Sequence, residues 1–194
     1  MTSELKVDKI SPASGTAFTL GDSGDTFTIP SGATITNSGT NGGGFGDVNS
    51  PYARLGFASS PAVTTGTNKT AEYSNILFAS DNSIVDTSAY KITPGVAGKY
   101  YIAAHINYAQ NAVDEKDYHL VIMVDGTEKA RHVVWASGTH STYGTDVYVS
   151  ATLDLTASNY VQIRVFQNSG SNAQYAYNDT AGLKNWFELF RIST

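Results

Sequence analysis

The stretch of residues 117–136, DYHLVIMVDGTEKARHVVWA, decides the fold class of this chain. Its first part, Asp117–Val124, contains no glycine or proline, and it has apolar side chains on both faces: Tyr118, Leu120 and Ile122 on one, Val121 and Met123 on the other. The pair Asp125-Gly126 separates it from a second strand candidate, Glu128–Ala136. Because Asp-Gly between two strand-like segments is the strongest short-range signal for a hairpin, the stretch predicts two antiparallel strands. The two apolar faces of Asp117–Val124 predict a central strand that is covered on both sides.

Segments with the same character continue on both sides of this hairpin. In Tyr160–Gln167, for example, Val161, Ile163 and Val165 share one face and alternate with polar residues, which is the period of a half-buried strand. The further strand candidates are Tyr52–Ala58, Ser74–Ala79, Ala89–Thr93, Gly98–Tyr108, Asp146–Leu155 and Lys184–Ile192. About nine short strands separated by turn signals predict an all-β sandwich or jelly roll over residues 51–194.

Residues 1–50 differ in composition from the rest. Residues 11–50 are mostly Gly, Ser, Thr, Asn and Asp, and short apolar pairs such as Phe18 with Leu20 recur at a spacing of roughly eight residues. One such unit cannot bury its own apolar face, so a repeat of this kind is stable only when it stacks on itself or on other chains. The pattern favours a short Gly/Thr-rich β-shaft, and a flexible linker is the alternative. We therefore divide the chain into an attachment segment and shaft (1–50) and a head (51–194).

The composition excludes several function classes. The 194 residues include no cysteine, which excludes a disulfide framework, thiol catalysis and a cysteine-ligated metal site. The net charge is −5, which argues against binding of a nucleic-acid backbone. The start of the chain has no apolar core of a secretory signal, and no apolar run is long enough to span a membrane. No cofactor and no metal site are expected.

Three segments of the head resemble a known superfamily. They are AYKITPGVAGKYYIAAHINY (89–108), ATLDLTASNYVQIRVFQN (151–168) and the closing strand WFELFRI (186–192). In this order they resemble the trimeric jelly-roll superfamily of the complement-one-q globular head and tumour necrosis factor. Ser158-Asn159 stands where the family usually has Gly-Asp, and Glu188 stands where its heads usually have glycine. The resemblance implies a homotrimer.

The N-terminal segment Ser3–Ser38 has a resemblance of its own. It looks like the opening of virion proteins from marine tailed phages, especially cyanophages, in which a short shaft precedes a complement-one-q-like head. The resemblance implies a trimeric virion fibre or appendage that is located in the virion. Its partners would be further copies of itself, tail, baseplate or capsid proteins, and a host surface glycan or protein.

Two other functions remain open at this stage. One is a capsid-bound head fibre or decoration protein without a receptor role, and the other is a polysaccharide depolymerase. The small head, the lack of a convergent carboxylate motif and the lack of a long β-helix argue against the depolymerase. We therefore predict a protein that is not an enzyme.

The resemblance assigns residues to the subunit interface, and the sequence itself suggests those of the attachment segment. Matching the family pattern strand by strand puts an aromatic-rich set near the trimer axis: Tyr101, Ala103, His105, Tyr148 and Trp186. In the first ten residues, charged side chains alternate with apolar ones, so a short strand there can add to the sheet edge of a virion partner. Leu5, Val7 and Ile10 are the attachment candidates.

Host recognition is expected on the loops of the head. Residues 137–145 and 169–177 combine tyrosine with Ser, Asn and Gly, which is the composition of adaptable recognition surfaces, although ordinary sandwich loops are the alternative. Tyr143, Tyr175 and Tyr177 are the candidates. His105 and His119 alternate with apolar neighbours and are interpreted as hydrogen-bonded strand histidines; an ion or anion held by three copies of His105 on the axis is left open.

Overall fold

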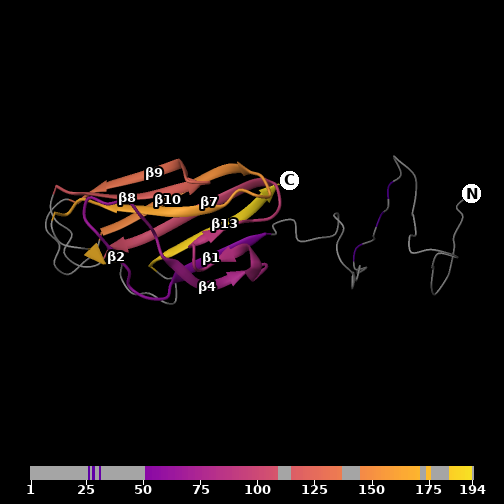
Figure 1. Ribbon diagram of the computed structural model, residues 1–194. Coiled ribbons are helices and arrows are strands. Elements are labelled where there is room, and N and C mark those ends of the chain that lie inside the picture. Colours follow the sequence, from indigo (N-terminus) through magenta and orange to yellow (C-terminus); the bar gives the residue numbers. More distant parts are fainter. Residues whose placement is uncertain are drawn as a thin grey trace, which may run out of the picture. The chain divides into compact units, whose positions relative to one another are not determined.

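Figure 1 presents a computed structural model of the chain. The structure describes residues 51–108, 115–136, 145–170 and 184–193, the backbone of 174–175, and residues 26, 28 and 31. The chain divides into two units, Met1–Gly46 and Asp47–Thr194, and the fold below is that of the second unit. Apart from the three isolated residues, the predicted attachment segment and shaft lie outside the described residues.

The head consists of two antiparallel sheets (Figure 1). The first sheet has the strand order β10 (Thr145–Leu155), β7 (Gly98–Tyr108), β13 (Trp186–Ser193), β1 (Tyr52–Phe57) and β4 (Tyr73–Ala79). The second has the order β5 (Val85–Asp86), β6 (Lys91–Ile92), β11 (Val161–Gln167), β8 (Asp117–Val124) and β9 (Thr127–Trp135), and β3 (Lys69–Thr70) also pairs with β11. A small ladder joins β2 (Ala62–Val63) to β12 (Gln174–Tyr175), and a 3₁₀ turn, η1, spans Asn82–Ile84.

The core lies between the two sheets and is formed by every second side chain of the long strands. The following core residues from both sheets are at most 1% exposed: Leu55, Tyr100, Ile102, Ala104, Ile106, Tyr118, Leu120, Ile122, Val161, Ile163, Val165, Phe187 and Leu189. The intervening residues of the same strands point away from the core, so the sandwich has two outer faces. A binding surface on the sheets therefore lies on one of these two faces.

The hairpin predicted at Asp125-Gly126 is confirmed. Val124 pairs with Thr127, and the two turn residues have φ values of 49° and 74°. Positive φ at both positions is the signature of a type I′ turn, whose twist matches that of the strands it joins. The Asp125 carboxylate accepts hydrogen bonds from the Tyr160 N–H (2.9 Å) and from Asn159 Nδ2 (2.5 Å). The turn is thereby tied to the start of β11.

The outward face of β8 is covered differently from the prediction. Val121 is only 1% exposed although it lies outside the core cluster. It is opposite Arg131 on β9 and Arg164 on β11. Both arginines donate to Glu128 Oε2, Arg131 Nη2 at 2.6 Å and Arg164 Nη2 at 2.8 Å. The aliphatic stems of these long side chains can cover an apolar residue while their charged ends stay in water. The sequence predicts that β8 is covered on both sides. On the outward side, this covering consists of paired polar side chains from the two neighbouring strands.

The expected strands agree with the structure within two residues for the long elements. The candidate Ala89–Thr93 shortens to β6, because Tyr90 has a φ of 55°, a left-handed conformation that a strand does not accept. The short strands β2, β3, β5 and β12 were not predicted, since two residues carry no measurable periodicity.

The two ends of the sandwich are distinct. At one end Pro51 accepts a hydrogen bond from the Arg191 N–H (3.2 Å), and the β8–β9 turn and Gly98 lie there as well. We call this the linker end, because Pro51, the first described residue of the head, lies there. The opposite end, which we call the loop end, holds the pairs Tyr108–Thr145 and Asp117–Trp135.

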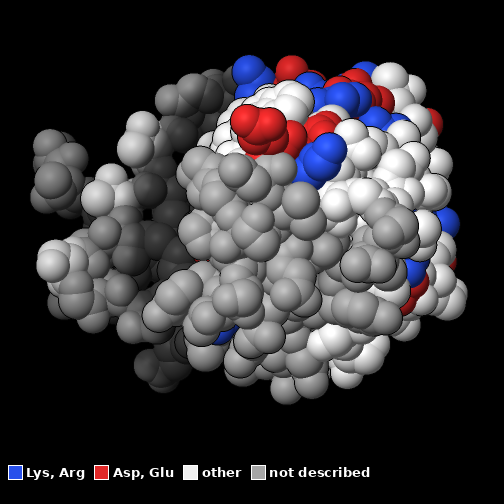
Figure 2. All heavy atoms as spheres, turned by 90° about the vertical axis from the view of Figure 1, so that its left-hand side faces the viewer, with Lys and Arg blue, Asp and Glu red and all other residues white. Residues whose placement is uncertain are grey.

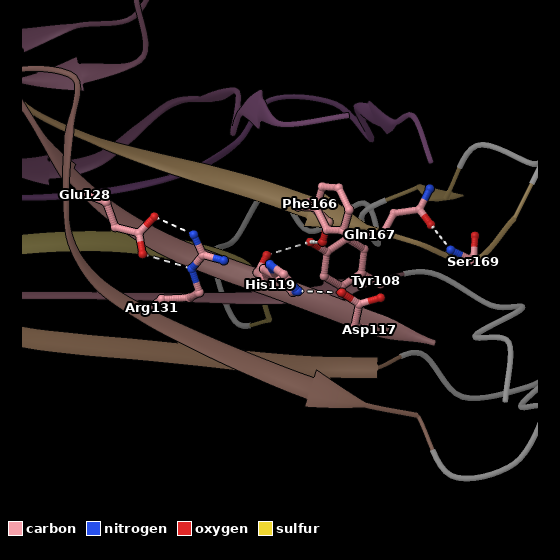
Figure 3. Close-up of polar contacts among 8 residues, drawn as sticks. All are labelled: Tyr108, Asp117, His119, Glu128, Arg131, Phe166, Gln167 and Ser169. Atoms are coloured by element: carbon pink, nitrogen blue, oxygen red, sulfur yellow. Dashed lines mark hydrogen bonds and ion pairs between the residues drawn. The ribbon is translucent and has the colours of Figure 1, made fainter. Parts of the chain in front are cut away.

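Tyr108 links the two sheets at the loop end (Figure 3). Its ring is buried, and its hydroxyl lies 3.0 Å from the carbonyl of His119 on β8 and 3.1 Å from that of Phe166 on β11. One hydroxyl from the first sheet thus reaches two neighbouring strands of the second. Burial raises the pKa of this hydroxyl, which keeps it a neutral donor.

We expect Tyr108→Phe to destabilise the head by about 1–2 kcal/mol, because a buried hydrogen-bond donor is lost and two carbonyls lose a contact. For a domain of this size that corresponds to a decrease in Tm of about 2–8 °C in a thermal melt. Tyr160→Phe is the matched control, since its hydroxyl makes no hydrogen bond in the described part of the chain. Equal melting temperatures for the two variants would contradict this role of Tyr108.

Candidate subunit interface

The outer face of the five-stranded sheet carries three rows of side chains, which the register of the strands sets side by side. The first row runs Tyr148, His105, Trp186, Gly56. The second runs Ser150, Ala103, Glu188, Arg54, Phe78, and the third runs Thr152, Tyr101, Phe190, Tyr52. All five residues predicted for the interface lie in these rows on one face. Their role in assembly stays a prediction.

Small residues allow two tyrosines to meet across the rows. The Tyr101 and Tyr148 hydroxyls are 2.6 Å apart, although one residue of each strand lies between their rows. Those intervening residues are Ala103 and Ser150, and Ala103 is completely buried. A larger side chain at position 103 would separate the two rings. The hydrogen bond between the hydroxyls raises the pKa of Tyr101.

Trp186 lies at the centre of the aromatic contacts on this face. The Arg54 guanidinium lies 4.6 Å from the centre of its ring system, in cation–π geometry. Tyr148 meets it edge-on at 5.9 Å, and His105 stacks at 6.2 Å between ring centres. Strands β1, β7 and β10 thus all contribute to the surroundings of one side chain on β13.

His105 is held by partners on both ring nitrogens, as predicted for a strand histidine. Nδ1 donates to the carbonyl of Lys184, and Nε2 lies 3.3 Å from the Asp146 carboxylate. His119 is likewise paired, with Asp117 at 2.6 Å. In the described residues, no group of three or more histidines and carboxylates is arranged to hold a metal ion.

Several residues of the face were not predicted from the sequence. A hollow of about 340 Å³ lies beside the predicted residues and is lined by Tyr52, Ala53, Phe78, Glu188, Leu189 and Phe190. Phe190 could have been found, because it follows Trp186 and Glu188 with period two. Phe78 could not, because the pairing of β1 with β4 shifts register between Arg54 and Leu55. Such a bulge changes which side chains share a face.

Glu188 forms an ion pair inside this largely aromatic surface. Its carboxylate lies 3.3 Å from Arg54 Nη1, so the position where the family usually has glycine holds a charge that the neighbouring strand balances. Burial raises the pKa of Glu188, and the nearby Arg54 opposes that rise. The arrangement therefore offers aromatic rings, one balanced ion pair and a hollow, which is the composition of a protein-binding face.

The remaining predicted residues cannot be placed in the same way. Tyr175 belongs to β12, whose backbone pairs with Ala62 of β2. Tyr143, Tyr177 and the attachment residues Leu5, Val7 and Ile10 lie outside the described residues. Within the described ranges, no helix is long and apolar enough to cross a membrane.

Comparisons with known proteins agree with this architecture. No protein-family model matches the chain. The chain is 23% identical over 146 residues to the phage-like element PBSX protein XkdV of Bacillus subtilis (strain 168). That match covers 73% of this chain and 21% of the relative, so the chain spans about a fifth of the length of the curated relative it matches.

Three solved structures share this fold. The globular domain of zebrafish complement 1qA gives a TM-score of 0.52 at 17% identity, covering 73% of this chain and 96% of that domain. Eiger TNF from S. frugiperda gives 0.51 at 12% identity (73% and 92% covered), and murine APRIL gives 0.52 at 8% identity (73% and 98% covered). The predicted all-β jelly-roll sandwich of complement-one-q and tumour-necrosis-factor type is confirmed.

The raised pKa of Glu188 predicts a pH dependence of stability. Between the ordinary value of 4.5 and the raised pKa, the folded head binds more protons than the unfolded chain, so stability falls as pH rises through this interval. Glu188→Gln should remove that slope in thermal melts recorded from about pH 4 to pH 7.

Glu128→Gln is the control with the opposite sign. Hydrogen bonding to Arg131 lowers the pKa of Glu128, so this residue contributes stability that is lost as pH falls. If Glu188→Gln retains the slope of the unsubstituted protein, the assignment of the raised pKa is wrong.

Proposed function

We propose that this chain is a structural virion protein of a tailed phage, a homotrimeric fibre or appendage whose heads associate through the outer face of the five-stranded sheet. The observation that carries the proposal is the aromatic surface of that face. On it Phe78 is 53% exposed, Tyr148 40% and Phe190 39%. Contiguous exposed aromatic groups of this kind mark interaction sites on proteins.

The partner of this face is a second copy of the head. Trp and Tyr side chains with an arginine among them are enriched at interface centres, and Arg54, Trp186 and Tyr148 form such a group here. Homo-oligomers with closed symmetry are the commonest soluble assemblies. The resemblance to a superfamily of trimeric heads favours three copies, and the fold shared with complement 1qA and TNF supports that number.

The likeness to a phage-like element protein supports the virion context. Because the linker end leads to residues 1–50, we assign Leu5, Val7 and Ile10 to attachment, with a tail, baseplate or capsid protein as partner. The loop end then carries host recognition, with Tyr143, Tyr175 and Tyr177 as contacts to a surface glycan or protein. No catalytic step is assigned to the chain. Electron microscopy of particles distinguishes a tail fibre from a capsid-bound decoration protein.

The assembly predicts a mass in solution near three times 20.6 kDa by sedimentation equilibrium. Phe78→Ser should weaken the trimer by at least about tenfold in its dissociation constant, because a large apolar side chain that is 53% exposed on the single head would be lost from the interface. Trp135→Ala is the matched control, since Trp135 is exposed on the other sheet. A mass of 20.6 kDa at every concentration would overturn the trimer.

Deletion of Met1–Ile10 tests the attachment segment. We expect the truncated chain to remain a soluble trimer, because the head and its aromatic face are intact, and to be missing from assembled particles. Immunoblotting of purified particles against the full-length protein measures this. Incorporation at the normal level would refute the assignment of Leu5, Val7 and Ile10.

A further inference from the structure

The outer face of the second sheet carries a different surface at the loop end. Trp135 is 67% exposed, more than any other large apolar residue among the described ones. It lies directly opposite Asp117 on β8, so the indole and the carboxylate point to the same side of the sheet. A tryptophan exposed to this extent, at the end of the head farthest from the linker, has no role in the fold described above.

The next row of the same face contains an ordered polar pair. His119 lies between Val133 on β9 and Phe166 on β11, and its ring is 4.8 Å from the Phe166 ring. His119 Nε2 lies 2.6 Å from Asp117 Oδ2 (Figure 3). In the described part of the chain, Asp117 Oδ1 and His119 Nδ1 make no hydrogen bond. Beneath them, the hydroxyl of Tyr108 holds the backbones of β8 and β11 together.

The third row is charged but balanced. Two guanidinium groups, of Arg131 and Arg164, meet the Glu128 carboxylate, and the Asp117 carboxylate lies two rows away. Figure 2, which views the loop end, shows basic and acidic side chains intermixed along the upper part of the molecule, where β9 runs in Figure 1. From Trp135 to Arg131 the strand extends about 13 Å, the length of a short oligosaccharide.

We propose that this strip, composed of Trp135, Asp117, His119, Phe166 and Arg131, binds a neutral oligosaccharide of pyranose sugars. The CH-rich face of a sugar ring stacks on the exposed indole. Its hydroxyl groups donate to Asp117 Oδ1 and His119 Nδ1, and a further hydroxyl accepts from Arg131. The rigid sheet presents these groups without an ordering cost on binding.

The composition of the strip favours a sugar over a protein partner. A protein interface needs a contiguous apolar centre, such as the one on the other sheet, whereas here each aromatic group lies beside a hydrogen-bonding group: Trp135 beside Asp117, and Phe166 beside His119. That mixture matches a ligand whose surface offers both CH and OH groups. The inference rests on the proposed function, in which the loop end of the head faces away from the particle and meets a bacterial surface.

The test uses the full chain on an array of immobilised bacterial surface polysaccharides, namely lipopolysaccharide O-chains, capsular polysaccharides and cell-wall polysaccharides. We expect the unsubstituted protein to bind a subset of them. Trp135→Ala should weaken this binding at least tenfold, and Asp117→Asn by a smaller factor of about three to ten. Val96→Ser is the control, because Val96 is 42% exposed in the turn before β7, at the linker end.

Salt dependence tests the charge of the ligand. Binding of a neutral sugar should be equal at about 0.1 M and 1 M salt, because no net charge is paired. A large loss of binding at 1 M salt would overturn the assignment of a neutral ligand.

Two results would overturn the proposal: no binding to any polysaccharide, or unchanged binding by Trp135→Ala. If Trp135→Ala binds sugar normally and also fails to join particles, Trp135 is a contact to another virion protein. A monomer that still binds sugar through Trp135 would sink the proposed trimeric fibre and leave this inference intact. A trimer on particles that binds no sugar would support the proposed fibre and overturn this inference.

Discussion

The register that sets Trp186 beside His105 and His105 beside Tyr148 is the constraint on which the rest of the structure depends. Because side chains alternate along β7, β10 and β13, the same register that buries Ile102 and Phe187 turns the aromatic residues outward. A shift of one residue in any of these strands would exchange the two sets. The hydrophobic core and the candidate interface are therefore two consequences of one pairing.

The two outer faces of the sandwich differ in the chemistry that they offer. On the first sheet, the small residues Ala103 and Ser150 let tyrosines from different rows meet, which gives a broad aromatic face with one enclosed ion pair. On the second sheet, long charged side chains cover Val121, and among its described residues Trp135 alone is a large exposed apolar group. One face suits a copy of the chain, and the other suits a small polar ligand. In a homotrimer, the second face can bind a ligand only when it stays on the outside of the assembly.

The sequence was sufficient for the elements that have a local signal. The Asp125-Gly126 turn demands positive φ at both positions, and period-two alternation located β11. The resemblance to the complement-one-q superfamily placed Tyr101 and His105 on one outward face of β7. Features that depend on which distant strands pair could not be predicted from the sequence. Phe78 joins the candidate interface through a bulge, and the cover over Val121 depends on Arg131 and Arg164, which come from two different strands.

The central claim is that further copies of the head cover the aromatic face, and the accessibility of Trp186 tests it most directly. The chain has two tryptophans, so Trp135→Phe leaves Trp186 as the single tryptophan, whose fluorescence is excited selectively at the long-wavelength edge where tyrosine does not absorb. Acrylamide quenching of Trp186 in this variant should be weak, and it should rise severalfold when Phe78→Ser is added and the subunits separate. Quenching that is strong at the outset and unchanged by Phe78→Ser would contradict the account.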